Sequence, residues 1–188
     1  MTRKIVVLFA VSWSLAFCGL AQDEGFEFRG EVPAAVPDGT VVEAMIRDEP
    51  GSLGTTPLAR GRVEGGSFSI RLPAELDPEM LGEMRVCGAS SVNIAFVPYL
   101  DVVDGEETVG QFWRTRRTPG DWGMYGPSSY TYLAYVEEAF VAEEDCMGDL
   151  IELDLQPGWN LYSRIVTESG SLTTSAEPPA DFVWRFLR

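Results

Sequence analysis

The sequence has no histidine, and Lys4 is its only lysine. The absence of imidazole excludes Ser-His-Asp and Cys-His active sites as well as histidine metal ligands. The absence of lysine beyond the N-terminal segment excludes Schiff-base chemistry and a phosphate-loop lysine. A pair of carboxylates of the glycosidase kind needs neither residue, but no pattern selects such a pair among the 29 acidic residues.

Basic residues are scarce in general. The chain has 14 basic residues against 29 acidic ones, which gives a formal net charge of -15. Such a surface repels nucleic acid and anionic membranes, so neither is an expected partner. We expect the partner to be a protein or a carbohydrate.

The N-terminal segment has the order of a secretory signal. Arg3 and Lys4 precede an apolar run over residues 5–20, and the chain turns polar at residues 22–24. This pattern predicts a signal peptide over residues 1–21 and a mature domain over residues 22–188 that is periplasmic, on the cell surface or extracellular. The alternatives are a transmembrane anchor, which needs about 20 apolar residues, and lipidation at Cys18, because residues 15–18 resemble a bacterial lipobox apart from Phe17.

The predicted mature domain contains two cysteines, Cys87 and Cys146. An even number of cysteines in an exported protein is explained most simply by one disulfide. A metal site would need further soft ligands and a catalytic thiol would need a base, and the sequence offers neither.

Short runs of alternating apolar and polar residues recur along the mature domain and are separated by Gly, Pro and Asp. This pattern predicts an all-β fold, an antiparallel β-sandwich of about ten short strands, with at most one short helix beginning at Asp77. The expected strands are residues 26–32, 40–47, 58–63, 67–72, 92–103, 108–116, 130–142, 150–155, 160–167 and 182–187.

Three short pieces lie in the first part of the predicted mature domain, namely residues 28–32 (FRGEV), 38–42 (DGTVV) and 65–70 (GGSFSI). Through these pieces, residues 26–72 resemble the transthyretin-like or carboxypeptidase-regulatory-like β-sandwich modules of uncharacterised exported bacterial proteins. The resemblance implies a sandwich fold with an accessory or adhesive role, and it carries over no catalytic residue.

Large aromatic residues fall in and beside a loop-like stretch, residues 118–129. Trp122 and Tyr125 lie within it, and Trp113 and Tyr130 flank it. Because exposed loops rarely contain such side chains without a purpose, we expect these four residues to form a binding loop for a sugar or a protein. The alternative interpretation is that the loop folds back and the side chains cover one end of the sandwich.

Two further candidate sites depend on charge. Arg114 and Arg116 would lie on one face of a strand and could hold an anion, although pairing with nearby acids is the simpler alternative. Two acidic groups could hold calcium, although neither matches a helical calcium loop and a solvated turn is the simpler alternative. These groups are Asp101, Asp104, Glu106 and Glu107, and Glu143, Glu144, Asp145 and Asp149.

The sequence thus predicts an exported, non-catalytic binding or interaction module of the periplasm or cell surface, with no required cofactor or metal. One alternative is an enzyme that acts on glycosides through a carboxylate pair. The other is a small outer-membrane β-barrel, which the six-residue run at 67–72 disfavours because membrane strands need about 9 to 11 residues.

Overall fold

The computed structural model describes residues 25–33, 36–47, 56–88, 90–116, 122–123, 126–127 and 129–187. These residues form an all-β fold, which confirms the predicted class, and one 3-10 helix, η1 (Pro78–Met80), begins at the predicted cap, Asp77. The strands are β1 (Glu27–Glu31), β2 (Val41–Ile46), β3 (Thr56–Glu64), β4 (Ser67–Arg71), β5 (Gly82–Val86), β6 (Ser90–Val97), β7 (Leu100–Asp104), β8 (Glu107–Arg116), β9 (Trp122–Gly123), β10 (Gly126–Pro127), β11 (Tyr130–Val136), β12 (Phe140–Cys146), β13 (Asp149–Leu155), β14 (Gly158–Thr167), β15 (Gly170–Thr174) and β16 (Phe182–Leu187).

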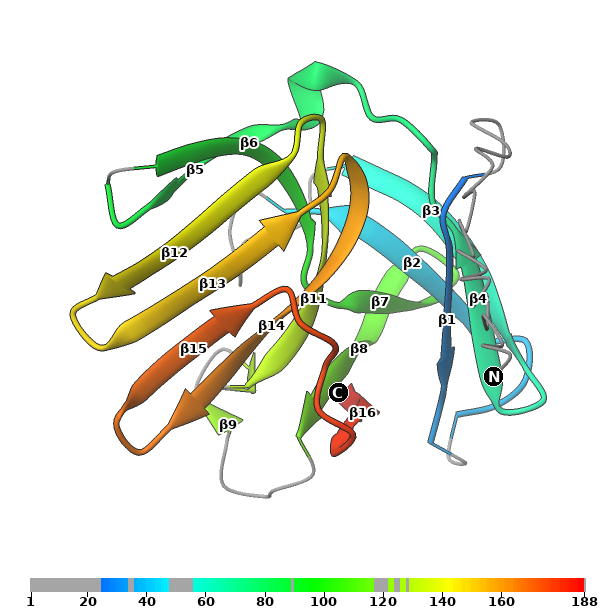
Figure 1. The fold of residues 1–188 in the computed structure, drawn as a ribbon. Coiled ribbons are helices and arrows are strands. Elements are labelled where there is room, and N and C mark those ends of the chain that lie inside the picture. Colours follow the sequence, from blue (N-terminus) through cyan, green and yellow to red (C-terminus); the bar gives the residue numbers. More distant parts are fainter. Residues whose placement is uncertain are drawn as a thin grey trace, which may run out of the picture.

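Hydrogen bonds connect fourteen of these strands into one sheet, and β9 and β10 form a separate two-stranded ribbon. One half of the sheet has the order β1-β4-β3-β2-β7-β8-β16, and the other half has the order β5-β6-β11-β14-β15-β13-β12. Figure 1 shows β1 to β4 on one side of the molecule and β5, β6, β12, β13 and β15 on the other. The halves meet where β8 pairs with β11 and where Arg47 pairs with Phe96.

Strand β11 lies between two hydrophobic cores and is buried along its whole length. Because side chains alternate along a strand, Tyr132 and Ala134 face one core while Leu133 faces the other. The core beneath Leu133 is filled by side chains of the first half, including Phe28, Phe68 and Phe112. This double burial explains why residues 130–136 read YTYLAYV, with almost no polar face.

A disulfide between Cys87 and Cys146 joins the two edges of the second half. Cys87 directly follows β5 and Cys146 ends β12, and their Cα atoms lie 5.6 Å apart. The Ser90 hydroxyl also donates a hydrogen bond of 2.6 Å to the Glu144 carboxylate across the same seam. The predicted disulfide is therefore present, and it closes the curled sheet around the core beneath Tyr132.

The strand count was predicted too low. Pro98 divides the run expected at 92–103 into β6 and β7, because proline cannot donate a ladder hydrogen bond. Residues 137–139 divide the run expected at 130–142 into β11 and β12, and β5 and β15 were not expected. The described strand pairs are antiparallel except β13 with β15, which is parallel, and the division into a two-sheet sandwich stays a prediction.

Candidate functional site

The predicted aromatic binding loop divides into buried and undescribed residues. Trp113 is 3% exposed and Tyr130 is 8% exposed. Their ring centroids lie 5.7 Å apart inside the core that also contains Tyr132. These two residues therefore belong to the core and not to a surface, which corrects that part of the expectation. The Trp122 backbone pairs with Pro127, whereas the Trp122 side chain and Tyr125 lie outside the described residues.

The two candidate anion contacts lie on β8 with partly buried side chains. Burial lowers the pKa of Arg114, and the charge of Glu177 opposes this shift. The Arg116 Nε atom lies 3.6 Å from a carboxylate oxygen of Asp181, and its guanidinium lies 5.7 Å from the Phe182 ring centroid. Arg116 thus has an internal acidic partner, as the simpler alternative proposed.

Two neighbouring ion pairs connect β3, β2 and β7. The Arg47 guanidinium donates to Asp101 at 2.5 Å, and both side chains are 4% exposed. Arg60 donates to Glu43 at 2.7 Å, and Glu43 lies directly opposite Asp101 in the register of the two strands. Burial raises the pKa of Asp101, Arg47 opposes this shift and Glu43 adds to it. The Arg47 guanidinium also lies 4.0 Å from the Tyr99 ring centroid.

This cluster brings together two carboxylates that the sequence could not select. A general acid and base must reach a substrate, but the Glu43 side chain is 9% exposed and the Asp101 side chain is 4% exposed. Each carboxylate also accepts a hydrogen bond from an arginine. The cluster therefore fits a structural ion-pair network, in which two opposite charges offset the cost of burying each other.

The acidic groups considered for calcium are divided among different partners. Asp101 belongs to the buried ion pair, while Asp145 accepts a hydrogen bond from the Gly148 amide and Asp149 accepts one from the Ser171 hydroxyl. Within the described residues, the one group of three potential ligands close enough to share an ion is Cys87, Glu144 and Cys146. Its two sulfur atoms form the disulfide, so they are not free to bind a metal.

The β12–β13 hairpin presents an outer face of acidic and apolar side chains, which we call the acidic hairpin face. Glu143 lies opposite Glu152, and neither has a hydrogen-bond or ion-pair partner among the described residues. Val141 lies opposite Asp154 and is 71% exposed. The face consists of Val141, Glu143, Asp145, Met147, Leu150, Glu152 and Asp154.

Two properties make this face unusual. Residues 118–163 contain nine acidic residues and no basic residue, so no arginine from the hairpin or its neighbours in sequence can neutralise it. Of the four large hydrophobic side chains that are exposed among the described residues, three lie here, namely Val141, Met147 and Leu150. A hollow of about 570 Å³ lies along the face, between β12, β13 and the segment after β15. Like charges placed opposite each other destabilise a sheet, so the sequence retains an unfavourable arrangement here.

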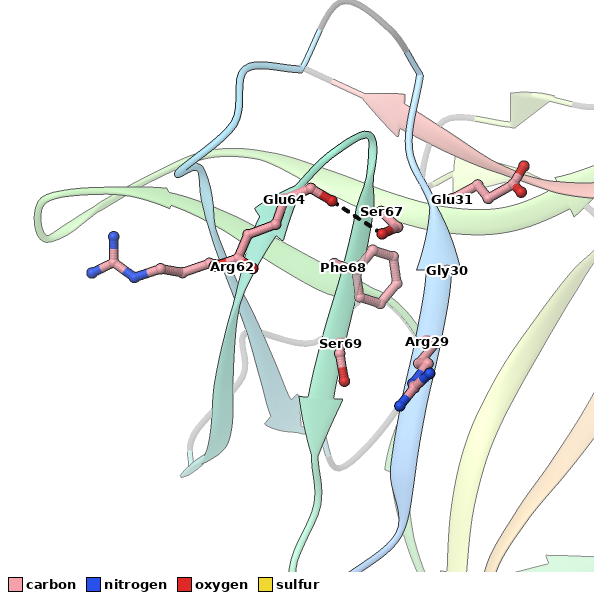
Figure 2. Close-up of a pocket in the computed structure, with 8 residues that line it drawn as sticks. All are labelled: Arg29, Gly30, Glu31, Arg62, Glu64, Ser67, Phe68 and Ser69. Carbon is pink, nitrogen blue, oxygen red and sulfur yellow. Dashed lines mark hydrogen bonds between the residues drawn. The ribbon is translucent and has the colours of Figure 1, made fainter.

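A second hollow, of about 600 Å³, lies over β1, β4 and β3, and we call it the serine groove. Figure 2 shows β4 in the middle with Ser67 and Ser69, flanked by β1 and β3. The short serine side chains leave space between longer charged side chains on the two neighbouring strands. The lining consists of Arg29, Gly30, Glu31, Arg62, Glu64, Ser67, Phe68 and Ser69.

Sequence reasoning missed both surfaces. The acidic residues of the hairpin were noted, but the face they share with Val141 and Leu150 depends on the turn at residues 147–148. The serine groove also requires β1, and only the long-range pairing of β1 with β4 brings β1 beside the β3–β4 hairpin. The alternation of polar residues in each strand was the available signal.

No helix in the described part of the chain combines the length and apolar character needed to span a bilayer. Comparisons with protein-family models, with curated proteins and with solved structures found no significant match to this chain. The resemblance of residues 26–72 to transthyretin-like modules accordingly stays a prediction.

Proposed function

We propose that this protein is an exported, non-catalytic binding module of the cell envelope, and that its acidic hairpin face binds a basic protein partner. The observation that carries the proposal is a coincidence on one hairpin. Glu143 and Glu152 have no hydrogen-bond or ion-pair partner among the described residues, and three of the four exposed large hydrophobic side chains of those residues lie beside them. Carboxylates supply attraction and orientation, while apolar side chains supply contact area once water is excluded.

The charge arrangement supports a cationic partner. Glu143 and Glu152 lie directly opposite each other, and no arginine in the described part of the chain forms an ion pair with either. An arginine or lysine from a partner would remove their mutual repulsion, so part of the binding free energy would come from relief of an unfavourable interaction in the free protein.

The apolar residues support a protein partner over an isolated cation. Val141 is 71% exposed and Leu150 is 47% exposed, at opposite ends of the strand pair. Burying the exposed part of each side chain would contribute about 1 kcal/mol, by the usual value of about 25 cal/mol per Å² of apolar surface. A small inorganic ion would gain nothing from these contacts.

The disulfide supports an oxidising location, because such bonds persist outside the cytoplasm and are rare inside it. The proposed export signal at residues 1–21 agrees with that location.

The test uses a synthetic peptide of eight residues, alternating arginine and valine, titrated into the protein by calorimetry. We expect the double variant Glu143→Gln/Glu152→Gln to bind at least about fivefold more weakly and with a shallower salt dependence. The control is Glu106→Gln/Glu107→Gln. Glu106 lies in the turn between β7 and β8 and Glu107 begins β8, so this variant changes the net charge equally at another exposed acidic hairpin.

The apolar contribution is tested separately. Val141→Ser/Leu150→Ser should weaken binding about tenfold, whereas Val109→Ser, which removes an apolar side chain that is 44% exposed on β8, should leave it unchanged. Equal effects of the two acidic pairs, together with no effect of the apolar variants, would mean that only the net charge attracts the peptide, and would refute the hairpin as a binding face.

A further inference from the structure

We propose that the serine groove is a second binding site, and that it takes a saccharide carrying a carboxylate, such as a uronic acid residue within a glycan. The proposal concerns residues on the opposite half of the sheet from the acidic hairpin face, so it stands independently of the function proposed above. It rests on the strand register, on the hydrogen bonds around the serines and on the distribution of charge.

The register places two matching rows of side chains across three strands. Ser69 lies opposite Arg29 on one side and Arg62 on the other, so its row has two cations around a hydroxyl. Ser67 lies opposite Glu31 and Glu64 in the same way, so its row has two carboxylates around a hydroxyl. The two rows are adjacent on one face, because residues i and i+2 of a strand point in the same direction.

Some of these groups are held in place by internal hydrogen bonds. Glu27 accepts hydrogen bonds of 2.7 Å from both Ser69 and Arg29, and these bonds lower the pKa of Glu27. Ser67 donates to the backbone carbonyl of Glu64 at 3.1 Å. Arg29 and the two serines thus form an ordered floor on which a ligand can rest.

Other groups remain available to a ligand. Arg62, Glu31 and Glu64 are exposed, and their charged ends have no hydrogen-bond or ion-pair partner among the described residues. In Figure 2 the Arg62 side chain extends away from β4. We expect it to turn inward on binding, at the entropic cost of ordering a long side chain.

The available groups fit a saccharide because they include donors and acceptors within one small area. Arginine donates through a planar fork that matches a carboxylate, while carboxylates and serine hydroxyls accept and donate hydrogen bonds to sugar hydroxyls. The volume of about 600 Å³ lies within the range of small-molecule sites. The groove therefore offers a place for one acidic group and several hydroxyls.

The charges around the groove favour a ligand with one carboxylate over a ligand with many. Arg62 is exposed and has no ion-pair partner among the described residues, so its guanidinium favours an anionic group on the ligand. A polyanion would meet Glu31 and Glu64 in the next row and the repulsion of the whole molecule. A ligand with an isolated carboxylate among hydroxyls satisfies both rows.

The test compares two disaccharides that differ in one group. Cellobiuronic acid carries a carboxylate where cellobiose carries a hydroxymethyl group, and each is titrated into the ¹⁵N-labelled full-length mature protein. We expect saturable amide shifts at residues 29–31 and 62–69, and at least a tenfold preference for the acidic sugar. Arg62→Ala should remove that preference while the protein stays folded, since this side chain is exposed.

The control variant is Arg85→Ala, which removes an exposed arginine that pairs with Glu83 on β5, in the other half of the sheet. It should leave the preference unchanged. Absence of saturable shifts in the groove, equal affinity for the two sugars, or an Arg62→Ala variant that keeps the preference would each overturn the proposal.

Discussion

Arg47 and Asp101 show what a single buried charge requires of its surroundings. Both side chains are 4% exposed, and the pair is joined by a hydrogen bond of 2.5 Å. Removing either charge from water costs several kcal/mol, which the partner offsets only while it is present. The stability of this pair is therefore conditional on both residues.

We expect Arg47→Met to reduce the free energy of unfolding by about 3 to 5 kcal/mol near neutral pH, because it leaves the Asp101 carboxylate buried without its cationic partner. The double variant Arg47→Met/Asp101→Leu should recover most of that loss, since it removes both charges. Urea unfolding of the wild type, the single variant and the double variant measures these free energies. A double variant as unstable as the sum of the single variants would contradict the account.

The same variant has an expected pH dependence. Burial already raises the pKa of Asp101 above the ordinary value of 3.8, and Arg47 is the main opposing influence. Losing Arg47 raises this pKa further, so the folded state favours the protonated carboxyl more strongly. A raised folded pKa gives stability that is present below the unfolded value and is lost as pH rises through the folded value. The loss of unfolding free energy caused by Arg47→Met should thus be smaller near pH 4 than near pH 8. A loss of equal size at both pH values would contradict this pKa argument.

At the scale of elements, the disulfide closes the half of the sheet that contains the acidic hairpin face. Cys87 and Cys146 are 59 positions apart in sequence and join the edge strands β5 and β12. A cross-link over this distance stabilises the folded chain by about 4 kcal/mol in the chain-entropy description, and measured values are commonly about 2 to 4.

We expect Cys87→Ser/Cys146→Ser to lower the free energy of unfolding by about 2 to 4 kcal/mol and to increase amide hydrogen exchange most in β5, β12 and β13. Strands β1 to β4 belong to the other half and serve as the internal reference. Exchange that rises equally in both halves would show that the disulfide stabilises the molecule only globally and does not hold this seam.

The strands also show how much of the fold could be predicted from the sequence. Alternating residues such as those of β1 and β4 predicted these strands of the first half well. β11 and β12 were predicted as one strand because residues 137–139 (EEA) carry no Gly, Pro or Asn to signal a turn. β15 was missed because it is stabilised by its two neighbours, β13 and β14, between which it lies in the sheet. Sequence periodicity does not reveal such neighbours.

Candidate sites were harder to predict, because they depend on register. Trp113 on β8 and Tyr130 on β11 are buried because both side chains pack into the core beneath Tyr132. The sequence does not show this packing, so the aromatic-rich stretch was interpreted as a binding surface. Arg29 and Arg62 are 33 positions apart, and only the pairing of both strands with Ser69 brings them onto one face. The pairing of Cys87 with Cys146 was predictable, because no other cysteine lies beyond the predicted signal peptide at residues 1–21.

At the scale of the whole molecule, the proposed export can be tested by mass. A mature chain that begins at residue 22 and contains the disulfide should react with a thiol reagent only after reduction, at two sites. The intact mass of the protein isolated from its producing cell, with and without reduction and alkylation, checks this. A diacylglyceryl group on Cys18 would instead show a membrane-tethered form, and thiols that react without reduction would contradict the disulfide.

The net charge of -15 adds a long-range field to the local contacts of the hairpin. Attraction between exposed charges is screened over about 8 Å at physiological ionic strength. Salt should accordingly slow the association of a basic partner more than it speeds dissociation. A basic partner would therefore be attracted to the whole molecule and oriented by the acidic hairpin face.

The most direct measurement maps where a basic peptide binds. The alternating arginine and valine peptide is added to ¹⁵N-labelled protein at physiological salt, and amide shifts are followed on both exposed acidic hairpins. We predict saturable shifts over β12 and β13, and much smaller ones at the turn of residues 104–107, which has similar charge without Val141 and Leu150. Shifts of equal size at both hairpins, or shifts confined to the turn at 104–107, would contradict the proposed binding face.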